Sequence, residues 1–247
     1  MSSGLSQSGS LKASRGYQAF TYRAGMGLIP TAEFVSFFDD FVQPVATNLP
    51  FGWATVGTID VGATAVLATA VPAGSTGAII IASDGASEGV TVLGSKALQP
   101  VAGKKFFIET RVQTTLAAET DVQFGLTDQT STANPEDAWT TTAASLIAFG
   151  TLAGSALTKM LSDKSNSGST AETGTRSLVN NTYATLGIFY DGTKLFGFVD
   201  GKQSVAWSQA AATIPTGIVL SPFFGARTGA TAGNTTTFDY FRYVMER

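Results

Sequence analysis

Residues 183–207 read YATLGIFYDGTKLFGFVDGKQSVAW and contain two Asp-Gly pairs, Asp191-Gly192 and Asp200-Gly201. Acidic residues beside glycines occur in metal and sugar sites, and they also occur in turns. The segments on either side of each pair have β-type sequences, and Asp-Gly is a favoured hairpin turn because glycine adopts positive φ without steric cost. The stretch therefore predicts a meander of strand, turn, strand, turn and strand.

Short β-type segments recur from residue 33 to the C-terminus, separated by glycine, proline and Asp-Gly signals. Many short strands at close spacing predict an all-β fold, an antiparallel β-sandwich. Residues 164–177 are polar and are expected to form a flexible connection. The expected strands lie within residues 33–42, 51–71, 77–83, 90–95, 105–115, 120–128, 145–153, 156–163 and 183–246.

The 247-residue chain contains no cysteine and no histidine, and 13% of its residues are charged. The lack of cysteine excludes disulfides, thiolate chemistry and cysteine-ligated zinc. The lack of histidine removes the commonest general base and the commonest metal ligand. An enzyme built from this chain would have to use carboxylates, lysine or tyrosine.

Charge and hydropathy exclude several partners. The net charge of −3 does not fit a nucleic-acid binder. The first twenty residues lack the charged start and apolar run of a signal peptide, and the apolar segments are too short to span a bilayer. The sequence therefore predicts a protein made in a cytoplasm, with no nucleic-acid or membrane partner.

Residues 1–35 are predicted to form an extended N-terminal arm before a sandwich domain of residues 36–247. Three cations, and no anion, precede the first acidic residue, Glu33, and aromatic residues lie among them. Either the arm is a loose terminus, or it binds a partner chain, because disordered segments are usually poor in aromatic residues. The second alternative is preferred, and its partner-binding residues would be Lys12, Arg15, Tyr17, Phe20, Tyr22 and Arg23.

The run GIFYDGTKLFGFVDGKQSVAW, followed by IVLSPFFGARTGATAGNTTTFDYFRYVM, resembles the C-terminal half of concanavalin A-like jelly-roll domains. These domains include laminin G-like and lectin/glucanase sandwiches. The early FFDDF at residues 37–41, Trp53, and KKFFIETRVQ at residues 104–113 fit the same pattern. The resemblance covers roughly residues 36–247 and implies a jelly-roll sandwich.

Glucanases of this family carry their acids on one strand, in the form Glu-x-Asp-x-(x)-Glu, for retaining hydrolysis. The comparable place in this chain offers Glu109, then Thr110 and Arg111, and no second acid until Glu119. Glu109 beside Arg111 is typical of a surface strand pair. The sequence therefore predicts no catalytic residue, and a protein that is not an enzyme.

The legume-type lectins of the family bind calcium and manganese through clustered side chains, and no such cluster is visible here. Asp121, Asp128 and Asp137 could approach one another around a loop, although solvated loop acids are the preferred interpretation. Asp39-Asp40 is expected to form a bend with solvent-facing acids. No metal and no cofactor is predicted.

The three tryptophans, Trp53, Trp139 and Trp207, could stack on a sugar ring. Tryptophans in a sandwich are more often core or rim residues, so burial is the preferred interpretation for each of them.

A basic arm on such a sandwich, with a Thr/Ala/Gly-rich composition, is similar to tailed-bacteriophage virion proteins, especially capsid decoration proteins. This resemblance implies a structural protein on the capsid surface that binds the major capsid protein, as a homo-oligomer with a trimer favoured. The alternative is a carbohydrate-binding, lectin-like module of a phage fibre or adsorption structure. An enzyme acting on polysaccharide ranks last.

Overall fold

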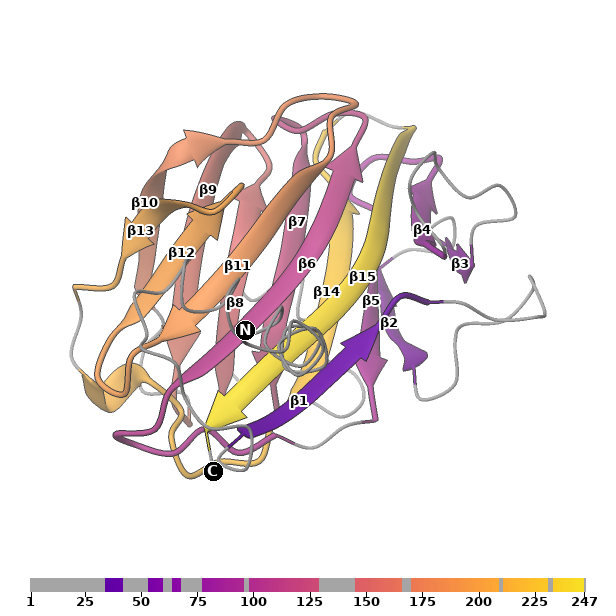
Figure 1. The fold of residues 1–247 in the computed structure, drawn as a ribbon. Helices are drawn as coiled ribbons and strands as arrows, with labels where there is room; N and C mark the ends of the chain where they lie inside the picture. The colour runs from indigo at the N-terminus through magenta and orange to yellow at the C-terminus, as the bar shows by residue number, and fades with distance from the viewer. Residues whose placement is uncertain are drawn as a thin grey trace, which may run out of the picture.

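The computed structural model describes residues 34–41, 53–59, 64–67, 77–95, 98–128, 145–165, 170–208, 211–230 and 233–246. In these residues two antiparallel β-sheets lie face to face, with sheet A in front of sheet B in Figure 1. The predicted all-β antiparallel sandwich is confirmed. Helical structure in the described ranges is limited to the short 3₁₀ helix η3, Ala211–Thr213, so none of it is long or apolar enough to cross a membrane.

Sheet A has eight strands, in the order β13-β12-β11-β6-β15-β4-β3, and β1 also pairs with β15. The long strand β15 pairs with β6 on one side, and on the other side with β4 along its first part and β1 along its second. The strands are β1 Phe34–Asp39, β3 Thr64–Leu67, β4 Ile79–Ser83, β6 Phe106–Thr114, β11 Ala184–Tyr190, β12 Leu195–Val199, β13 Lys202–Ala206 and β15 Asn234–Glu246.

Sheet B has seven strands, in the order β10-β9-β8-β7-β14-β5-β2. Its central strands β8, β7 and β14 lie behind the centre of sheet A (Figure 1). The strands are β2 Trp53–Ile59, β5 Gly89–Gly94, β7 Thr120–Thr127, β8 Leu146–Leu152, β9 Ser155–Asp163, β10 Thr170–Ser177 and β14 Ser221–Thr228.

The predicted meander is β11, β12 and β13, and both Asp-Gly pairs are turns. In the second turn Val199 pairs with Lys202, so Asp200 and Gly201 alone connect the strands, with φ of 50° and 73°. Two successive positive φ values are typical of the type I′ turn, whose twist matches that of the flanking strands. The Asp200 carboxylate also accepts a hydrogen bond from the Thr185 N–H at 2.9 Å, which ties the turn to β11.

The first turn of the meander is longer, because Tyr190 pairs with Leu195. Gly192 has a φ of 104°, which a residue with a side chain rarely adopts. Asp191 Oδ1 accepts hydrogen bonds from the Thr193 N–H, the Thr193 hydroxyl and the Lys194 N–H, each 2.7 Å long. The carboxylate therefore serves the turn, as the sequence predicts.

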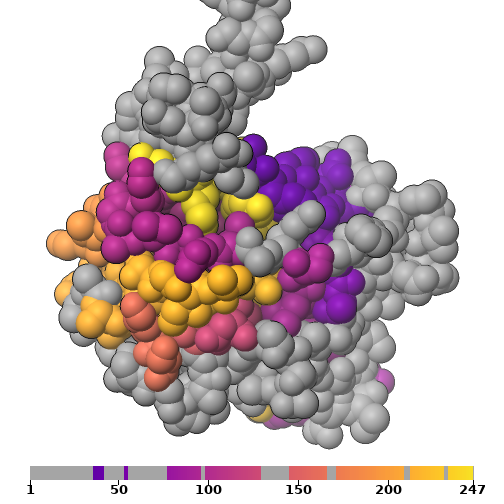
Figure 2. All heavy atoms as spheres, turned by 90° about the horizontal axis from the view of Figure 1, so that it is seen from below, coloured from indigo at the N-terminus to yellow at the C-terminus, as the bar shows by residue number. Residues whose placement is uncertain are grey.

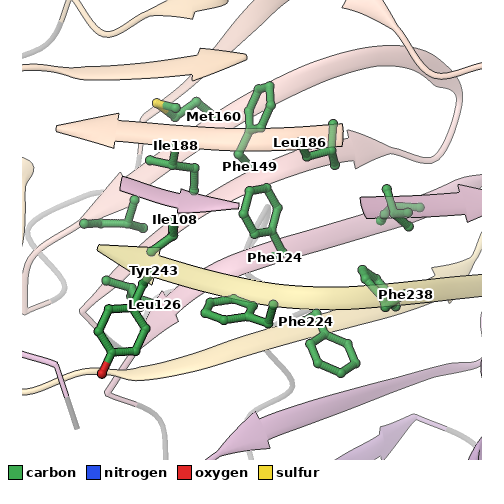
Figure 3. Close-up of a cluster of buried hydrophobic side chains, with 14 of the residues drawn as sticks. Ile108, Phe124, Leu126, Phe149, Met160, Leu186, Ile188, Phe224, Phe238 and Tyr243 are labelled. Carbon is green, nitrogen blue, oxygen red and sulfur yellow. The ribbon is translucent and has the colours of Figure 1, made fainter. Parts of the chain in front are cut away.

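The hydrophobic core lies between the two sheets. Figure 3 shows Ile108 and Leu186 of sheet A among Phe124, Phe149 and Met160 of sheet B. Residues at every second position along each strand supply these side chains, as the alternating pattern requires. Trp53 and Trp207 are buried in this core, which confirms the preferred interpretation for both.

The prediction of a flexible connection over residues 164–177 is wrong for its second half. Thr170–Ser177 form the edge strand β10, which pairs with β9. Gly174 of this strand faces inward, where an added Cβ would lie 2.3 Å from the Ser204 hydroxyl oxygen. The exposed residues of the strand are Ala171, Thr173, Thr175 and Ser177, and the inward Gly174 has no side chain, so the strand lacks the apolar alternation that reveals a strand in the sequence.

Candidate functional site

Glu109 lies on the outer face of sheet A and is buried, with 4% of its side chain exposed. It accepts a hydrogen bond from the Tyr240 hydroxyl at 2.8 Å and forms an ion pair with Arg242 at 3.1 Å. Arg111 instead pairs with Asp239, at 2.8 Å. The predicted surface pair of Glu109 with Arg111 is therefore wrong, because each side chain reaches across to β15 rather than along β6.

The surroundings of Glu109 fit a structural role. Burial lowers the pKa of Arg242 below its ordinary value, although the interaction with Tyr240 opposes that change. The Arg242 guanidinium carbon also lies 5.8 Å from the centre of the Phe107 ring, within the range of a cation–π contact. A carboxylate held by an arginine and a tyrosine is neutralised in place.

The polar row that the sequence analysis missed lies on β7, on the outer face of sheet B. Val122 and Phe124 point into the core. Thr120 also points inward, since its hydroxyl oxygen accepts a hydrogen bond from the side-chain amide of Asn234 on β15 of sheet A. Because side chains alternate along a strand, the other face presents the residues between them. That outward row consists of Glu119, Asp121 and Gln123.

Neighbouring strands bring further groups to this row. Asp121 accepts a hydrogen bond from the Ala153 N–H at the β8–β9 turn, and Arg227 of β14 lies opposite Asp121 in the ladder. The backbone carbonyl of Glu119 accepts a hydrogen bond from the Gly229 N–H at 2.6 Å. The carboxylate of Glu119 lies 3.7 Å from the position that a Cβ on Gly229 would occupy. Two carboxylates and a guanidinium thus share one end of the sheet face.

Glycines flank Gln123 on both sides. Its ladder partners are Gly225 of β14 and Gly150 of β8. At Gly150 an added Cβ would lie 1.6 Å from the Val122 carbonyl oxygen, so the close approach of the strands excludes any side chain there. The two glycines leave Gln123 without side-chain neighbours in its own row, but Gln123 itself is fully buried.

The other end of the same face is apolar. Phe223 of β14 and Ala148 of β8 are the ladder partners of Gly125, and they belong to a second buried cluster outside the main core. The outer face of sheet B thus changes from charged to apolar along β7. The cluster consists of Leu93, Leu146, Ala148, Leu161 and Phe223.

The row on β7 reads Glu-x-Asp-x-Gln and has two of the three acids of the glucanase form Glu-x-Asp-x-Glu. Residues two apart on a strand lie about 7 Å apart, so Glu119 and Asp121 are neighbours on one face. Gln123 occupies the third position, and a side-chain amide cannot deliver a proton as a carboxylic acid does. Glu119 lies in the turn before β7, which hid the row from a strand-by-strand search.

Asp121 and Asp128 do not approach one another, so the alternative of a shared metal site does not hold for this pair. The preferred interpretation of solvated loop acids is wrong for Asp121, which is buried on β7. The two residues lie at opposite ends of β7, and the Asp128 carboxylate accepts a hydrogen bond from the Ser145 N–H at 2.8 Å. Asp137 lies outside the described residues. In the part of the chain that the structure describes, no group of three Asp, Glu, His or Cys side chains is placed to hold a metal ion.

Asp39 is the last residue of β1 and does not face solvent freely, so the prediction of a solvent-facing acid is wrong for it. It accepts hydrogen bonds from the Phe41 N–H at 2.8 Å and from the Trp53 indole N–H at 2.9 Å. Phe41 has a φ of 56° and is fully buried against Trp53. The acid therefore fixes the backbone at the end of β1.

Several predicted residues fall outside the described ranges. Trp139 is among them, and so is the whole predicted arm, so its partner-binding role stays a prediction. The arm residues concerned are Lys12, Arg15, Tyr17, Phe20, Tyr22 and Arg23.

No family model and no curated protein matches the sequence. Solved structures do match the fold. A glycosyl hydrolase family protein from Mycobacterium fortuitum is 13% identical, with a TM-score of 0.56 over 84% of this chain and 98% of that one. The lectin UEA-II complexed with galactose is 14% identical, with a TM-score of 0.55 over 86% and 99%. Arcelin-5, a lectin-like defense protein from Phaseolus vulgaris, is 12% identical, with a TM-score of 0.52 over 87% and 99%.

The fold is a concanavalin A-like jelly roll. At these identities the likeness shows the fold alone, and it confirms the resemblance seen in the sequence. Several of the matched structures are glycoside hydrolases, and this finding contradicts the prediction that the chain is not an enzyme. These matches do not test the predicted capsid partner, the predicted trimer or the predicted virion location, which all stay predictions.

Proposed function

We propose that the chain is a carbohydrate-binding jelly-roll module, and that the sugar lies against β7 on the outer face of sheet B. The observation that carries the proposal is the outward row of Glu119, Asp121 and Gln123, with Arg227 opposite Asp121. Glu119 and Arg227 are partly exposed and would meet the sugar, whereas Asp121 and Gln123 are buried behind them. Carboxylates and a side-chain amide accept or donate the hydrogen bonds that sugar hydroxyls make.

The test of this proposal should include an assay for sugar hydrolysis, because Glu119 and Asp121 place two carboxylates next to each other at the start of one strand. Retaining glycosidases need a nucleophile and a proton donor, both usually carboxyl groups. With Gln123 in the third position, one of the two acids would have to donate the proton. Any sugar that binds should therefore also be assayed for cleavage.

The experiment is a glycan array on the full chain, followed by titration of the best glycan. We expect Glu119→Gln and Asp121→Asn to weaken binding at least tenfold, because each converts a charged acceptor into a neutral amide. Glu172→Gln is the matched control: Glu172 of β10 accepts from the Ser208 N–H and hydroxyl, away from β7, and an amide oxygen keeps both bonds. An array without any bound glycan, or equal losses in all three variants, would contradict the proposal.

Virion decoration is the second candidate function, and the charge of the arm favours it. Three cations and no anion precede Glu33 in a chain whose net charge is −3. A basic, aromatic segment suits an acidic protein surface such as a capsid shell. Deleting residues 1–23 removes all six predicted partner-binding residues, and we expect it to abolish binding to capsids while the far-ultraviolet circular dichroism is kept. Unchanged capsid binding by the deletion would rule out the arm as the anchor.

A further inference from the structure

Three flat side chains form a row on the outer face of sheet A. Tyr240 of β15 is the ladder partner of Arg111 on β6. Phe38 of β1 is the ladder partner of Arg242, two residues farther along β15. Phe241, between Tyr240 and Arg242, belongs to the core between the sheets, so its two neighbours and their ladder partners point outward. We call Phe38, Tyr240 and Arg111 the planar row.

The planar row begins with an exposed aromatic pair. Phe38 is 58% exposed, and its ring centre lies 5.6 Å from that of Tyr240. The Tyr240 hydroxyl donates a hydrogen bond to Glu109 at 2.8 Å, which holds the Tyr240 ring in place. In Figure 2, the strand β1 that carries Phe38 (indigo) adjoins β15 (yellow). Exposed apolar surface rimmed by polar groups is typical of a binding site.

Arg111, at the other end of the planar row, has a fixed orientation. Its guanidinium carbon lies 4.1 Å from the centre of the Tyr183 ring, and its Nη1 pairs with Asp239 Oδ2 at 2.8 Å. Among the residues that the structure describes, this is the one hydrogen bond that the Arg111 and Asp239 side chains make. Nε and Nη2 of Arg111 and Oδ1 of Asp239 therefore remain available beside the aromatic pair.

We propose that the planar row is a second sugar-binding surface, which takes a neutral oligosaccharide. One sugar ring lies on Phe38, because the C–H groups on one face of the sugar are apolar and pack on an aromatic ring. Hydroxyls of another ring accept hydrogen bonds from the unused nitrogens of Arg111 and donate to Asp239 Oδ1, since a hydroxyl can do both. This surface lies on sheet A, and the site proposed on β7 lies on sheet B, so either proposal can fail without the other.

The spacing of the planar row requires more than one sugar unit. Strand β15 lies between β1 and β6, so the two ends of the row are at least two inter-strand spacings apart, about 10 Å at about 4.8 Å each. A single sugar ring on Phe38 does not reach Arg111 across that distance. The ligand is therefore an oligosaccharide that runs across the strands.

The charges beside the planar row favour a neutral sugar chain over an acidic one. Arg111 pairs with Asp239, and Glu109 pairs with Arg242, so the charges of these four groups cancel. An acidic glycan at Arg111 would also meet the Asp239 carboxylate and be repelled by it. A single-stranded nucleic acid, which also stacks on rings, needs a positively charged groove along its backbone. A neutral sugar needs only the donors and the acceptor that the Arg111–Asp239 pair leaves unused.

Native electrophoresis of the full chain tests the proposal, in gels that contain laminarin, galactomannan or hydroxyethyl cellulose. These three polysaccharides are uncharged, and we expect at least one of them to retard the wild type. Phe38→Leu and Arg111→Lys should each reduce that retardation about fivefold or more, because the first loses the ring and the second loses the planar donor group. Phe38→Tyr keeps a ring and should keep the retardation.

The matched control is Val219→Ala. Val219 is nearly as exposed as Phe38, at 56%, but it precedes β14 of sheet B, so this variant should be retarded like the wild type. Phe38→Leu should have the same effect in the Glu119→Gln background, in which the site proposed on β7 is weakened. Urea denaturation of each variant separates a loss of folding from a loss of binding.

Three outcomes would overturn the proposal. The first is a wild type that none of the three neutral polysaccharides retards, or that only the acidic polysaccharide alginate retards. The second is equal retardation of Phe38→Leu and Phe38→Tyr, which would show that the ring does not contribute. The third is retardation that Glu119→Gln abolishes and Phe38→Leu leaves unchanged, which would restrict the sugar to sheet B and leave the proposed function intact.

Discussion

Asp191 shows how one carboxylate oxygen can hold a turn. Burial by itself would raise the pKa of Asp191, but the hydrogen bonds from Lys194 and Thr193 and the charge of Lys194 outweigh burial, so the pKa lies below its ordinary value. A lowered pKa in the folded state means that the ionised group stabilises the fold. This contribution is present above the pKa of the unfolded chain, and it is lost as the pH falls through the folded-state pKa.

We expect Asp191→Ala to lower the free energy of unfolding by about 1 kcal/mol at neutral pH, because the turn loses a charged acceptor of three hydrogen bonds. The difference from the wild type should shrink as the pH falls below the ordinary pKa of an aspartate. Urea denaturation across an acid pH series measures both effects. Asp191→Asn keeps a neutral acceptor and should lie between the two proteins. A deficit that is the same at every pH would show that the charge of Asp191 does not contribute.

The buried ion pair of Glu109 and Arg242 also gives a prediction for single substitutions. Removing one partner of a buried ion pair leaves the other charge uncompensated, so we expect Glu109→Gln to cost about 3 kcal/mol in the free energy of unfolding. The double variant Glu109→Leu with Arg242→Met should recover part of that loss, because no charge is then left unpaired. Denaturation curves of the three proteins test this, and a double variant less stable than Glu109→Gln would disprove the assignment.

Strands β7 and β8 approach so closely that glycine is required at Gly125 and at Gly150. An added Cβ would lie 1.8 Å from the Ile147 carbonyl oxygen at Gly125 and 1.6 Å from that of Val122 at Gly150. Backbone would have to move, since no side chain can rotate away. These contacts set the spacing of the strands that carry the proposed sugar-binding row.

We expect Gly150→Ala to lower the free energy of unfolding by about 2–3 kcal/mol, at the upper end for overpacking in a core. The expected result is a lower midpoint in urea with an unchanged slope. Thr173→Ala is the control: Thr173 is exposed on the edge strand β10, where a substitution should change stability by about 0.5 kcal/mol or less. A Gly150→Ala protein as stable as this control would mean that the two strands separate easily.

Two kinds of sequence signal determined which strands could be predicted, turn residues and the alternation of apolar with polar residues. Asp-Gly turns and alternating apolar residues located the meander and most of the strands. β10 was missed because it lacks that alternation. The pairing of Glu109 with Arg242 could not be predicted, because it depends on β6 and β15 being neighbours. The row that begins at Glu119 could be found only by extending the alternation of β7 back into the preceding turn.

The whole molecule shares its fold with hydrolases and lectins at 11–14% identity. What such chains have in common is the order of strands and the alternation that buries one face of each sheet. Neither property specifies chemistry, because outward residues can change without affecting the core. For this reason the fold was predictable from strand and turn signals, while the function has to be argued from particular outward side chains.

The proposed sugar site has a consequence for the stability of the whole molecule. A ligand that binds only the folded state, present at 100 times its Kd, stabilises that state by about 2.7 kcal/mol. For a domain of this size, each kcal/mol shifts the Tm by about 2–4 °C. We therefore expect the best glycan to raise the Tm by about 5–10 °C in the wild type and in Glu172→Gln, measured by calorimetry. At the same glycan concentration Glu119→Gln should show a clearly smaller shift, and equal shifts in all three proteins would place the sugar elsewhere on the molecule.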